Sequence, residues 1–275
     1  LKPEDGKPLN TLGDPWDITG DDNSGYGKII ATRGTSRWQA SEGPEIIYRN
    51  GYYYLFLAYG QLDVEYNTRV CRSENIDGPY VDMDGNSAIG SGNLYPILTA
   101  PYKFNNSYGW VGISHCGIFD DGNDNWFYTS QGRFPKNVGG NEYSNAIMMG
   151  HVRSIRWDAN GWPLVMPERY GAVPQVPITE KEIAGSWEHL SLTSSTGTQR
   201  ASETLTFDAG THKITSGSWK DASWTFDAAS QTITTSAGVV LYLQREVDWE
   251  ATPRTHTIVY AALGSQKTYW GKKVQ

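Results

Sequence analysis

The feature that most constrains this chain is a pair of apolar runs separated by Asn50-Gly51. The first run covers residues 45–48 and the second covers residues 52–59, and both are rich in β-branched and aromatic side chains. Both central residues of a type I′ turn need a positive φ, which Asn and Gly tolerate, so an Asn-Gly pair between such runs is a strong signal for a β-hairpin. The chain is therefore expected to build its core from short antiparallel strands.

The same alternation of short apolar runs and polar turns recurs between residues 38 and 165. The runs lie at residues 45–48, 52–59, 66–72 and 79–82, and again at residues 111–119, 126–131, 146–153, 155–157 and 162–165. Four short antiparallel strands of even spacing make one blade of a β-propeller, and blades bury their faces only by stacking around an axis. Residues 1–177 are therefore expected to contain two such blades, with loops over residues 1–37 and 85–110.

The character of the sequence changes near residue 178. Pro174, Pro177 and the charged residues 180–182 are interpreted as a linker. The apolar runs that follow lie at residues 185–192, 201–207, 212–218, 222–226, 232–235, 239–245, 255–263 and 267–272. About eight short strands joined by polar turns predict a small antiparallel barrel over residues 178–275. The expected fold class is thus all-β, with two domains.

Composition and charge limit the partners of the chain. A net charge of −7 and a pI near 5.3 argue against nucleic acid or an anionic membrane as a partner, because both require clustered Lys and Arg. No apolar run approaches the length of about 18 residues that a membrane span needs. Cys71 and Cys116 lie in different apolar runs and are expected to be free buried thiols rather than a disulfide. A neutral substrate is the simplest expectation.

One carboxylate stands out in the first hairpin. Glu42 precedes Gly43-Pro44, and Pro44, whose φ is fixed, is expected to push Gly43 towards an extended conformation. The backbone after Glu42 would then be stiff enough to aim its carboxylate, as a catalytic acid requires. The alternative is a solvated carboxylate at a strand edge, where Glu is mostly found. Glu45, three residues further on, is interpreted as structural.

Four segments share their order and spacing with one enzyme family. They are Glu42-Gly43-Pro44 before the tyrosine-rich strand, Tyr66-Asn67-Thr68-Arg69 with Asp77-Gly78-Pro79-Tyr80, His115-Cys116-Gly117-Ile118-Phe119, and residues 149–158 with 161–170. With these segments the chain resembles glycoside hydrolase family 43, in particular its two-domain extracellular endo-α-1,5-L-arabinanases. The resemblance implies that residues 1–177 are C-terminal blades of a five-bladed β-propeller and that residues 178–275 form a lipocalin-like barrel.

The resemblance also implies a catalytic role for Glu42. Inverting glycosidases use one carboxylic acid to protonate the leaving oxygen and a carboxylate, about 6.5–9.5 Å away, to deprotonate water. Glu42 matches the family's acid, and a donor of this kind needs burial or a neighbouring carboxylate to raise its pKa. Residues 1–9 resemble the segment just after the family's third-blade strand. The base aspartate and a second aspartate that orients the substrate are therefore expected upstream of residue 1.

The expected position of both aspartates upstream of residue 1 implies a partner chain. Two blades and a barrel would leave open sheet faces and edges, which folded proteins avoid. The chain is therefore expected to pair with an N-terminal chain of the same enzyme, which would carry both aspartates. The aspartates of the N-terminal loop match no base motif and are interpreted as solvated carboxylates; they are Asp14, Asp17, Asp21 and Asp22.

The family implies further site residues. His115 matches a histidine that faces the propeller axis, and it is expected to hold a calcium ion whose coordination shell is filled mostly by water or by groups upstream of residue 1. The alternative for His115 is packing within an apolar strand. Tyr59, Asn67 and Arg69 flank the strands that follow Glu42 and are candidates for contacts with sugar hydroxyls, with strand packing as the alternative.

The expected function is hydrolysis of α-1,5-L-arabinan with inversion, by an extracellular or periplasmic enzyme. An exo-acting arabinofuranosidase or xylosidase of the same fold is one alternative, since the shape of the cleft depends on loops outside these segments. A non-catalytic arabinan-binding protein is another, and it would lack both upstream aspartates.

Overall fold

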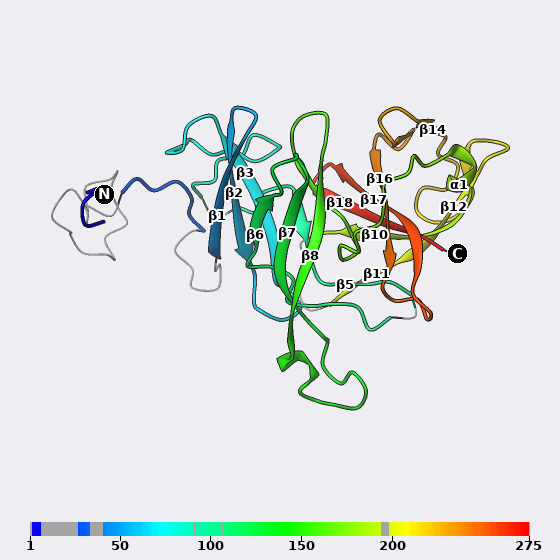
Figure 1. The fold of residues 1–275 in the computed structure, drawn as a ribbon, viewed down its shortest axis with the longest axis horizontal. Coiled ribbons are helices and arrows are strands. Elements are labelled where there is room, and N and C mark those ends of the chain that lie inside the picture. The colour runs from blue at the N-terminus through cyan, green and yellow to red at the C-terminus, as the bar shows by residue number, and fades with distance from the viewer. Residues whose placement is uncertain are drawn as a thin grey trace.

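The computed structural model describes residues 2–6, 27–33, 41–90, 92–105, 107–193 and 198–274. The described chain forms two four-stranded sheets side by side and an eight-stranded sheet that curls into a barrel (Figure 1). The predicted all-β class is confirmed, whereas five blades stay a prediction. Part of the predicted N-terminal loop, including the four aspartates between residues 14 and 22, lies outside the described residues.

The first sheet contains the predicted hairpin. Its strands, in spatial order, are β1 (Ser41–Arg49), β2 (Tyr52–Tyr59), β3 (Asn67–Ser73) and β4 (Ile97–Thr99). The type I′ turn is confirmed, because Asn50 has a φ of 49° and Gly51 a φ of 89°. Strand β2 begins and ends at the predicted residues, and its side chains from Tyr54 onward are buried.

The predicted fourth strand at residues 79–82 is wrong. Val81 makes only isolated bridges, and the sheet is completed instead by β4, from within the predicted loop at residues 85–110. The reason lies in the buried Asp82, whose carboxylate accepts hydrogen bonds from the backbone N–H groups of Asp84, Asn86 and Tyr95. These bonds fold the segment into a turn, because a short polar side chain competes with a strand ladder for backbone donors.

The second sheet has four strands, because the predicted runs at residues 146–153 and 155–157 belong to one strand. It consists of β6 (Gly117–Asp120), β7 (Trp126–Arg133), β8 (Met148–Trp157) and β9 (Pro163–Val165), with the 3₁₀ turn η1 (Ser144–Ala146) between β7 and β8. The predicted strand at residues 111–119 starts only at Gly117. Gly112 and His115 both have a positive φ, which interrupts an extended chain.

The barrel contains the predicted meander. Its strands are β10 (Gly185–Leu192), β12 (Glu203–Asp208), β13 (Lys213–Ile214), β14 (Trp224–Asp227), β15 (Thr232–Thr235), β16 (Val240–Asp248), β17 (Thr255–Gly264) and β18 (Lys267–Lys273). The edge strands β13 and β14 approach through a single bridge between Lys213 and Ser223, so the barrel is nearly closed. The predicted linker contains one turn of helix, α1 (Glu180–Ile183), where the side chain of Glu182 accepts a hydrogen bond from the Thr179 N–H.

One hydrophobic core joins the barrel to the two sheets. Leu190 and Trp270 of the barrel belong to the same buried cluster as Phe56 of the first sheet and Leu164 of the second. The indole N–H of Trp270 donates to the carbonyl of Val165 at 2.8 Å. A parallel pair of short strands, β5 (Tyr102–Lys103) and β11 (Arg200–Ala201), adds a backbone link. The predicted boundary near residue 178 falls between β9 and β10 and stays a prediction.

Two smaller predictions concern the cysteines and the membrane. Cys71 and Cys116 are both free and buried, as predicted. Within the described residues, no helix has the length and apolar character that would let it span a bilayer.

Candidate active site

Glu42 lies in a β-bulge at the start of β1. In the ladder with β2, Glu42 faces Ala58 and Glu45 faces Phe56, so Gly43 and Pro44 together oppose a single residue. Gly43 has a φ of +55°, which corrects the extended conformation predicted for the residue before Pro44. Glycine lacks a Cβ and tolerates this left-handed region, and the bulge requires it. A bulge of this kind re-aims the neighbouring side chain, here the carboxylate of Glu42.

Glu42, Tyr66 and His115 form a connected group. The hydroxyl of Tyr66 donates to Oε1 of Glu42 at 2.6 Å, and Nδ1 of His115 lies 3.2 Å from the same hydroxyl. Nδ1 of His115 is also 3.8 Å from Oε1 of Glu42. Tyr66 is buried, whereas the side chains of His115 and Glu42 are 57% and 58% exposed. Burial and then the bond to Glu42 raise the pKa of Tyr66, which keeps its hydroxyl protonated.

The exposure of Glu42 differs from the burial that a proton donor was expected to need. Its side chain is open to solvent on one side and fixed by the buried Tyr66 on the other. A neighbouring carboxylate, the second expected influence on a donor, stays a prediction.

The backbone around His115 is held in an unusual conformation. His115 has a φ of +57° and lies in a bend before β6 rather than within the predicted strand. Its ring packs against Gly43 so closely that a Cβ at position 43 would lie 3.0 Å from ring atoms. Bulge and bend therefore fix each other, which places the imidazole beside the carboxylate.

A network of buried hydroxyl groups holds the residues that precede this bend. Thr68 Oγ1 lies 2.7 Å from both Ser114 Oγ and Tyr128 Oη, and Thr99 donates to the carbonyl of Ile113 at 2.7 Å. The network ties β3, β4 and β7 to the segment that precedes His115. Buried polar groups that satisfy one another make a local structure specific, so the position of His115 is set by three strands.

The predicted sugar-binding residues form a buried cluster of their own. Asn67 donates to the carbonyl of Tyr59 at 3.1 Å and accepts from Nε of Arg69 at 2.8 Å. Arg69 also donates to the carbonyl of Leu94, and its guanidinium lies 5.3 Å from the ring centre of Tyr59. All three side chains are buried, so in this structure they brace β2 and β3. Contact with a sugar hydroxyl stays a prediction for Tyr59, Asn67 and Arg69.

The donors at His115 do not by themselves suit calcium. Calcium takes six to eight hard oxygen ligands, and the described residues close to the imidazole supply one carboxylate, from Glu42, and the hydroxyl of Tyr66. A calcium ion at His115 stays a prediction that would need water and groups from elsewhere. The one acidic cluster within the described ranges, Glu168 with Asp248 and Glu250, surrounds the ammonium group of Lys272 instead.

Sequence reasoning missed Tyr66. Of its motif, Tyr66-Asn67-Thr68-Arg69, the sequence predicts only the amide of Asn67 and the guanidinium of Arg69 as site groups. The signal that could have identified it is its place, because a residue just before β3 lies at the same end of the sheet as the start of β1.

The described chain thus combines two blade-like sheets and a barrel with an exposed carboxylate that is hydrogen-bonded to a buried tyrosine and lies next to a histidine. The chain belongs to glycosyl hydrolases family 43, whose family model matches residues 12–163. A second model, described as a C-terminal lipocalin-like domain, matches residues 167–271.

Named relatives and a solved structure agree with this membership. The chain is 31% identical over 186 residues to extracellular endo-α-(1→5)-L-arabinanase 2 of Bacillus subtilis strain 168, covering 60% of this chain and 38% of that protein. It is 30% identical over 129 residues to an extracellular exo-α-(1→5)-L-arabinofuranosidase of Cellvibrio japonicus strain Ueda107, covering 45% of this chain and 33% of that protein. The chain thus spans well under half the length of these relatives.

The fold of the whole described chain has a solved counterpart. The structure of endo-1,5-α-L-arabinanase from Thermotoga petrophila RKU-1 matches with a TM-score of 0.76 at 23% identity, covering 92% of this chain and 58% of that one. At this identity the match establishes a shared fold, which includes the barrel as well as the two blade-like sheets.

Proposed function

We propose that this chain is part of an extracellular enzyme that hydrolyses α-1,5-L-arabinan from within the polymer and with inversion, and that Glu42 is its general acid. The observation that carries the proposal is the hydrogen bond of 2.6 Å between Tyr66 and Glu42 beside His115, in a chain of family 43. The Bacillus subtilis relative is named an extracellular endo-arabinanase, which supports both the substrate and the location.

In the proposed mechanism Tyr66 contacts Glu42 in both of its protonation states. While Glu42 holds its proton on Oε2, the hydroxyl of Tyr66 donates to Oε1 at 2.6 Å and leaves the acidic proton free to face the substrate. Glu42 then gives this proton to the leaving oxygen of the arabinan chain. The bond from Tyr66 strengthens as the carboxylate forms, because charge-assisted hydrogen bonds are the stronger kind.

The water that attacks the sugar needs a base on the opposite face. For an inverting enzyme this carboxylate lies about 6.5–9.5 Å from the acid. We propose that the base aspartate, and a second aspartate that orients the substrate, belong to a segment that precedes residue 1, on an N-terminal chain of the same enzyme.

An exo-acting enzyme is the second candidate, because the Cellvibrio japonicus relative is named an exo-arabinofuranosidase. The reaction products distinguish an endo-acting from an exo-acting enzyme. An endo-acting enzyme releases a ladder of oligosaccharides from linear arabinan at early times, whereas an exo-acting enzyme releases one small product throughout.

The acid is tested with Glu42→Gln in the complete enzyme. Removing a positioned general acid costs about 10²–10⁴-fold in rate, so turnover on linear arabinan should fall by that factor while arabino-oligosaccharides still bind. Glu45→Gln, three residues further along β1, is the matched control and should keep its turnover. Wild-type turnover in Glu42→Gln would refute the assignment, and a complete enzyme that binds arabinan without ever cleaving it would point to the binding protein.

A further inference from the structure

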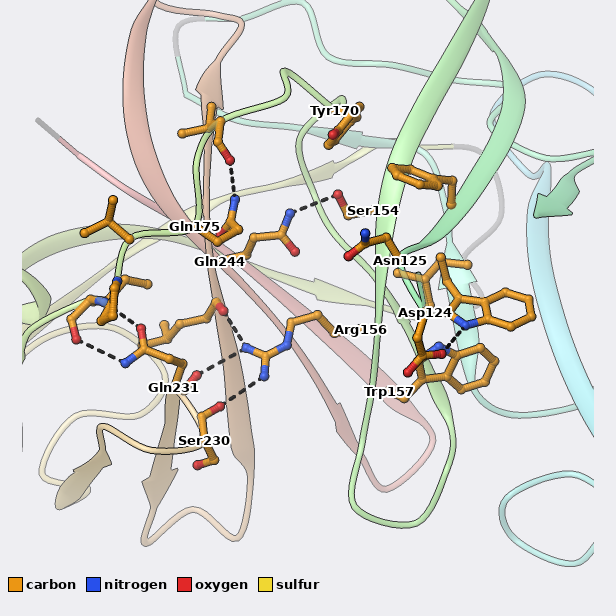
Figure 2. A pocket seen from close by; sticks show the side chains of 18 of the residues that line it. Asp124, Asn125, Ser154, Arg156, Trp157, Tyr170, Gln175, Ser230, Gln231 and Gln244 are labelled. Carbon is orange, nitrogen blue, oxygen red and sulfur yellow. Dashed lines mark hydrogen bonds between the residues drawn. The ribbon is translucent and has the colours of Figure 1, made fainter. Parts of the chain in front are cut away.

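A cavity of about 620 Å³ lies between the second sheet and the barrel. Its walls come from β8, from the turn between β6 and β7, from residues 170–178, and from barrel residues 229–231 and 243–244 (Figure 2). Pockets for small ligands have volumes of about 300–1,000 Å³ and often occur where two domains meet. Both the volume and the position of this cavity therefore suit a small ligand.

The cavity is remote from the candidate active site. Arg49, which lines it, closes β1, whereas Glu42 lies near the start of that strand. Glu42 and Arg49 are seven residues apart along β1, which at about 3.3 Å per residue corresponds to roughly 23 Å. A ligand in the cavity would thus occupy a second site.

The charged groups of the cavity are already engaged. The guanidinium of Arg49 pairs with Asp124 at 3.2 Å and lies 4.3 Å from the ring centre of Trp157. The guanidinium of Arg156 donates to the backbone carbonyls of Ser230, Gln231 and Leu243, which joins β8 to the barrel (Figure 2). Because these hydrogen bonds occupy the cations, the cavity favours a neutral ligand over an anion.

The polar groups that remain are neutral. Gln244 donates through Nε2 to Ser154 Oγ at 2.9 Å, and within the described part of the chain no donor reaches its Oε1. Asn125 donates through Nδ2 to Asp121, and its Oδ1 likewise has no partner among the described residues. The Ser154 hydroxyl still has its own proton to donate. These groups can accept from, and donate to, the hydroxyls of a ligand.

One partly exposed aromatic residue lines the cavity together with them. Tyr170 lines the cavity and is 42% exposed, and its ring stands edge-on to Phe127 with ring centres 5.0 Å apart. Its backbone is fixed by a hydrogen bond to Val152 at 2.7 Å. A fixed aromatic platform beside amides and a hydroxyl is the kind of lining that a neutral, hydroxyl-rich ring would contact.

We propose that this cavity is a second carbohydrate-binding site, which holds a neutral oligosaccharide segment between the second sheet and the barrel. The sugar ring packs on Tyr170 while its hydroxyls bond to Gln244, Ser154 and Asn125. That the segment belongs to arabinan rests on the proposed function. Binding the polymer at a remote site raises the effective concentration of substrate at Glu42 through the shared chain.

The test uses the intact enzyme with Glu42→Gln, which prevents hydrolysis during binding measurements. Arabino-oligosaccharides from linear arabinan, and xylo-oligosaccharides in parallel, are titrated by calorimetry, and linear arabinan is tested by affinity electrophoresis. Adding Tyr170→Ala should weaken binding of the polymer about tenfold, equivalent to about 1.4 kcal/mol. Adding Gln244→Ala should weaken it in the same direction. Tyr108→Ala is the matched control, because Tyr108 is 61% exposed and does not line the cavity.

Each outcome decides the proposal. The proposal is overturned if both cavity variants keep the affinity of the parent and melt near its melting temperature. It is also overturned if neither the arabino-oligosaccharides nor the xylo-oligosaccharides bind. Hydrolysis of arabinan by the enzyme with Glu42 intact reports on the proposed function separately. If that enzyme cleaves no arabinan but Tyr170→Ala loses affinity for one of the oligosaccharides, the proposed function fails while the second site stands.

Discussion

The hydroxyl of Tyr66 lies 2.6 Å from Oε1 of Glu42, and it joins a buried ring to an exposed carboxylate. The two residues are 24 positions apart and meet because β1 and β3 flank β2 in one sheet. A rigid hydroxyl beside a solvent-exposed acid restricts its rotamers, and orientation of a catalytic group contributes directly to rate.

Tyr66→Phe removes this hydroxyl and keeps the ring. A hydrogen bond to a charged group is worth about 1.5–3 kcal/mol, so kcat on arabinan should fall by about 10–100-fold. Turnover is measured on linear arabinan, and the melting temperature is measured in parallel. A variant with a lower melting temperature but an unchanged kcat would show that Tyr66 is only structural.

Gly43→Ala tests the bulge that aims Glu42. The left-handed φ of +55° would strain an alanine, and its Cβ would press on the ring of His115 at 3.0 Å. Strain of this type costs about 1–3 kcal/mol, and displacement of His115 and Glu42 should lower kcat as well.

Gly51→Ala is the matched control for this variant. Gly51 also has a positive φ, of +89°, but a Cβ there meets nothing within 4 Å. It should lower the melting temperature with little change in kcat. Equal effects of the two variants on kcat would show that the contact between Gly43 and His115 is unimportant.

The sequence predicted those elements whose signals are local. Asn50-Gly51 specified its hairpin, and the runs that became β2, β10 and β15 end at the predicted residues. By contrast, β4 has three residues in a loop-like stretch, and its pairing with β3 depends on the turn that Asp82 stabilises. No local pattern indicates such a pairing.

The candidate site likewise has features that local sequence predicts and features that depend on the tertiary fold. Glu42 was found through its motif, whereas its bond to Tyr66 depends on the order of strands in the sheet. The extended conformation predicted for Gly43 from the residue that follows it is wrong, because the β-bulge between Glu42 and Glu45 requires a positive φ there. The approach of His115, 49 residues from Tyr66, requires two sheets to pack together.

Lys272 is a buried cation surrounded by three carboxylates at the junction of the sheets and the barrel. Its ammonium group lies 3.0 Å from Glu168, 2.9 Å from Asp248 and 2.8 Å from Glu250, and its side chain is 3% exposed. Lys272→Met leaves these carboxylates without their cation, and breaking a buried ion pair on one side costs about 3–5 kcal/mol. Chemical denaturation at pH 7 should show a loss of this size.

Glu168→Gln is the matched control for that experiment. Burial, reinforced by the charge of Glu250, raises the pKa of Glu168 well above its usual range, because both disfavour the charged form of this carboxyl. Replacing it with a neutral amide of the same shape should therefore change the free energy of unfolding much less than Lys272→Met does. A loss as large as that of Lys272→Met would show that Glu168 is ionised in the folded protein.

His189 makes the stability of the barrel depend on pH. It is buried, with Nδ1 2.7 Å from the hydroxyl of Tyr260, and burial lowers its pKa to about 3. The unfolded chain binds this proton near pH 6.5, so the stability is fully present above that pH and is lost as the pH falls towards 3. Within this window His189 contributes a slope of about 1.4 kcal/mol per pH unit.

His189→Gln should flatten this dependence, because an amide does not titrate and its oxygen can still accept from Tyr260. The free energy of unfolding is measured by denaturant titration at pH 8, 6, 5 and 4, and the value at pH 8 isolates the effect of the substitution on packing. Some acid sensitivity should persist, because burial also lowers the pKa of His151 to about 3. If the variant loses stability between pH 6 and pH 4 as steeply as the wild type does, His189 takes up a proton in the folded state and this explanation of its burial is wrong.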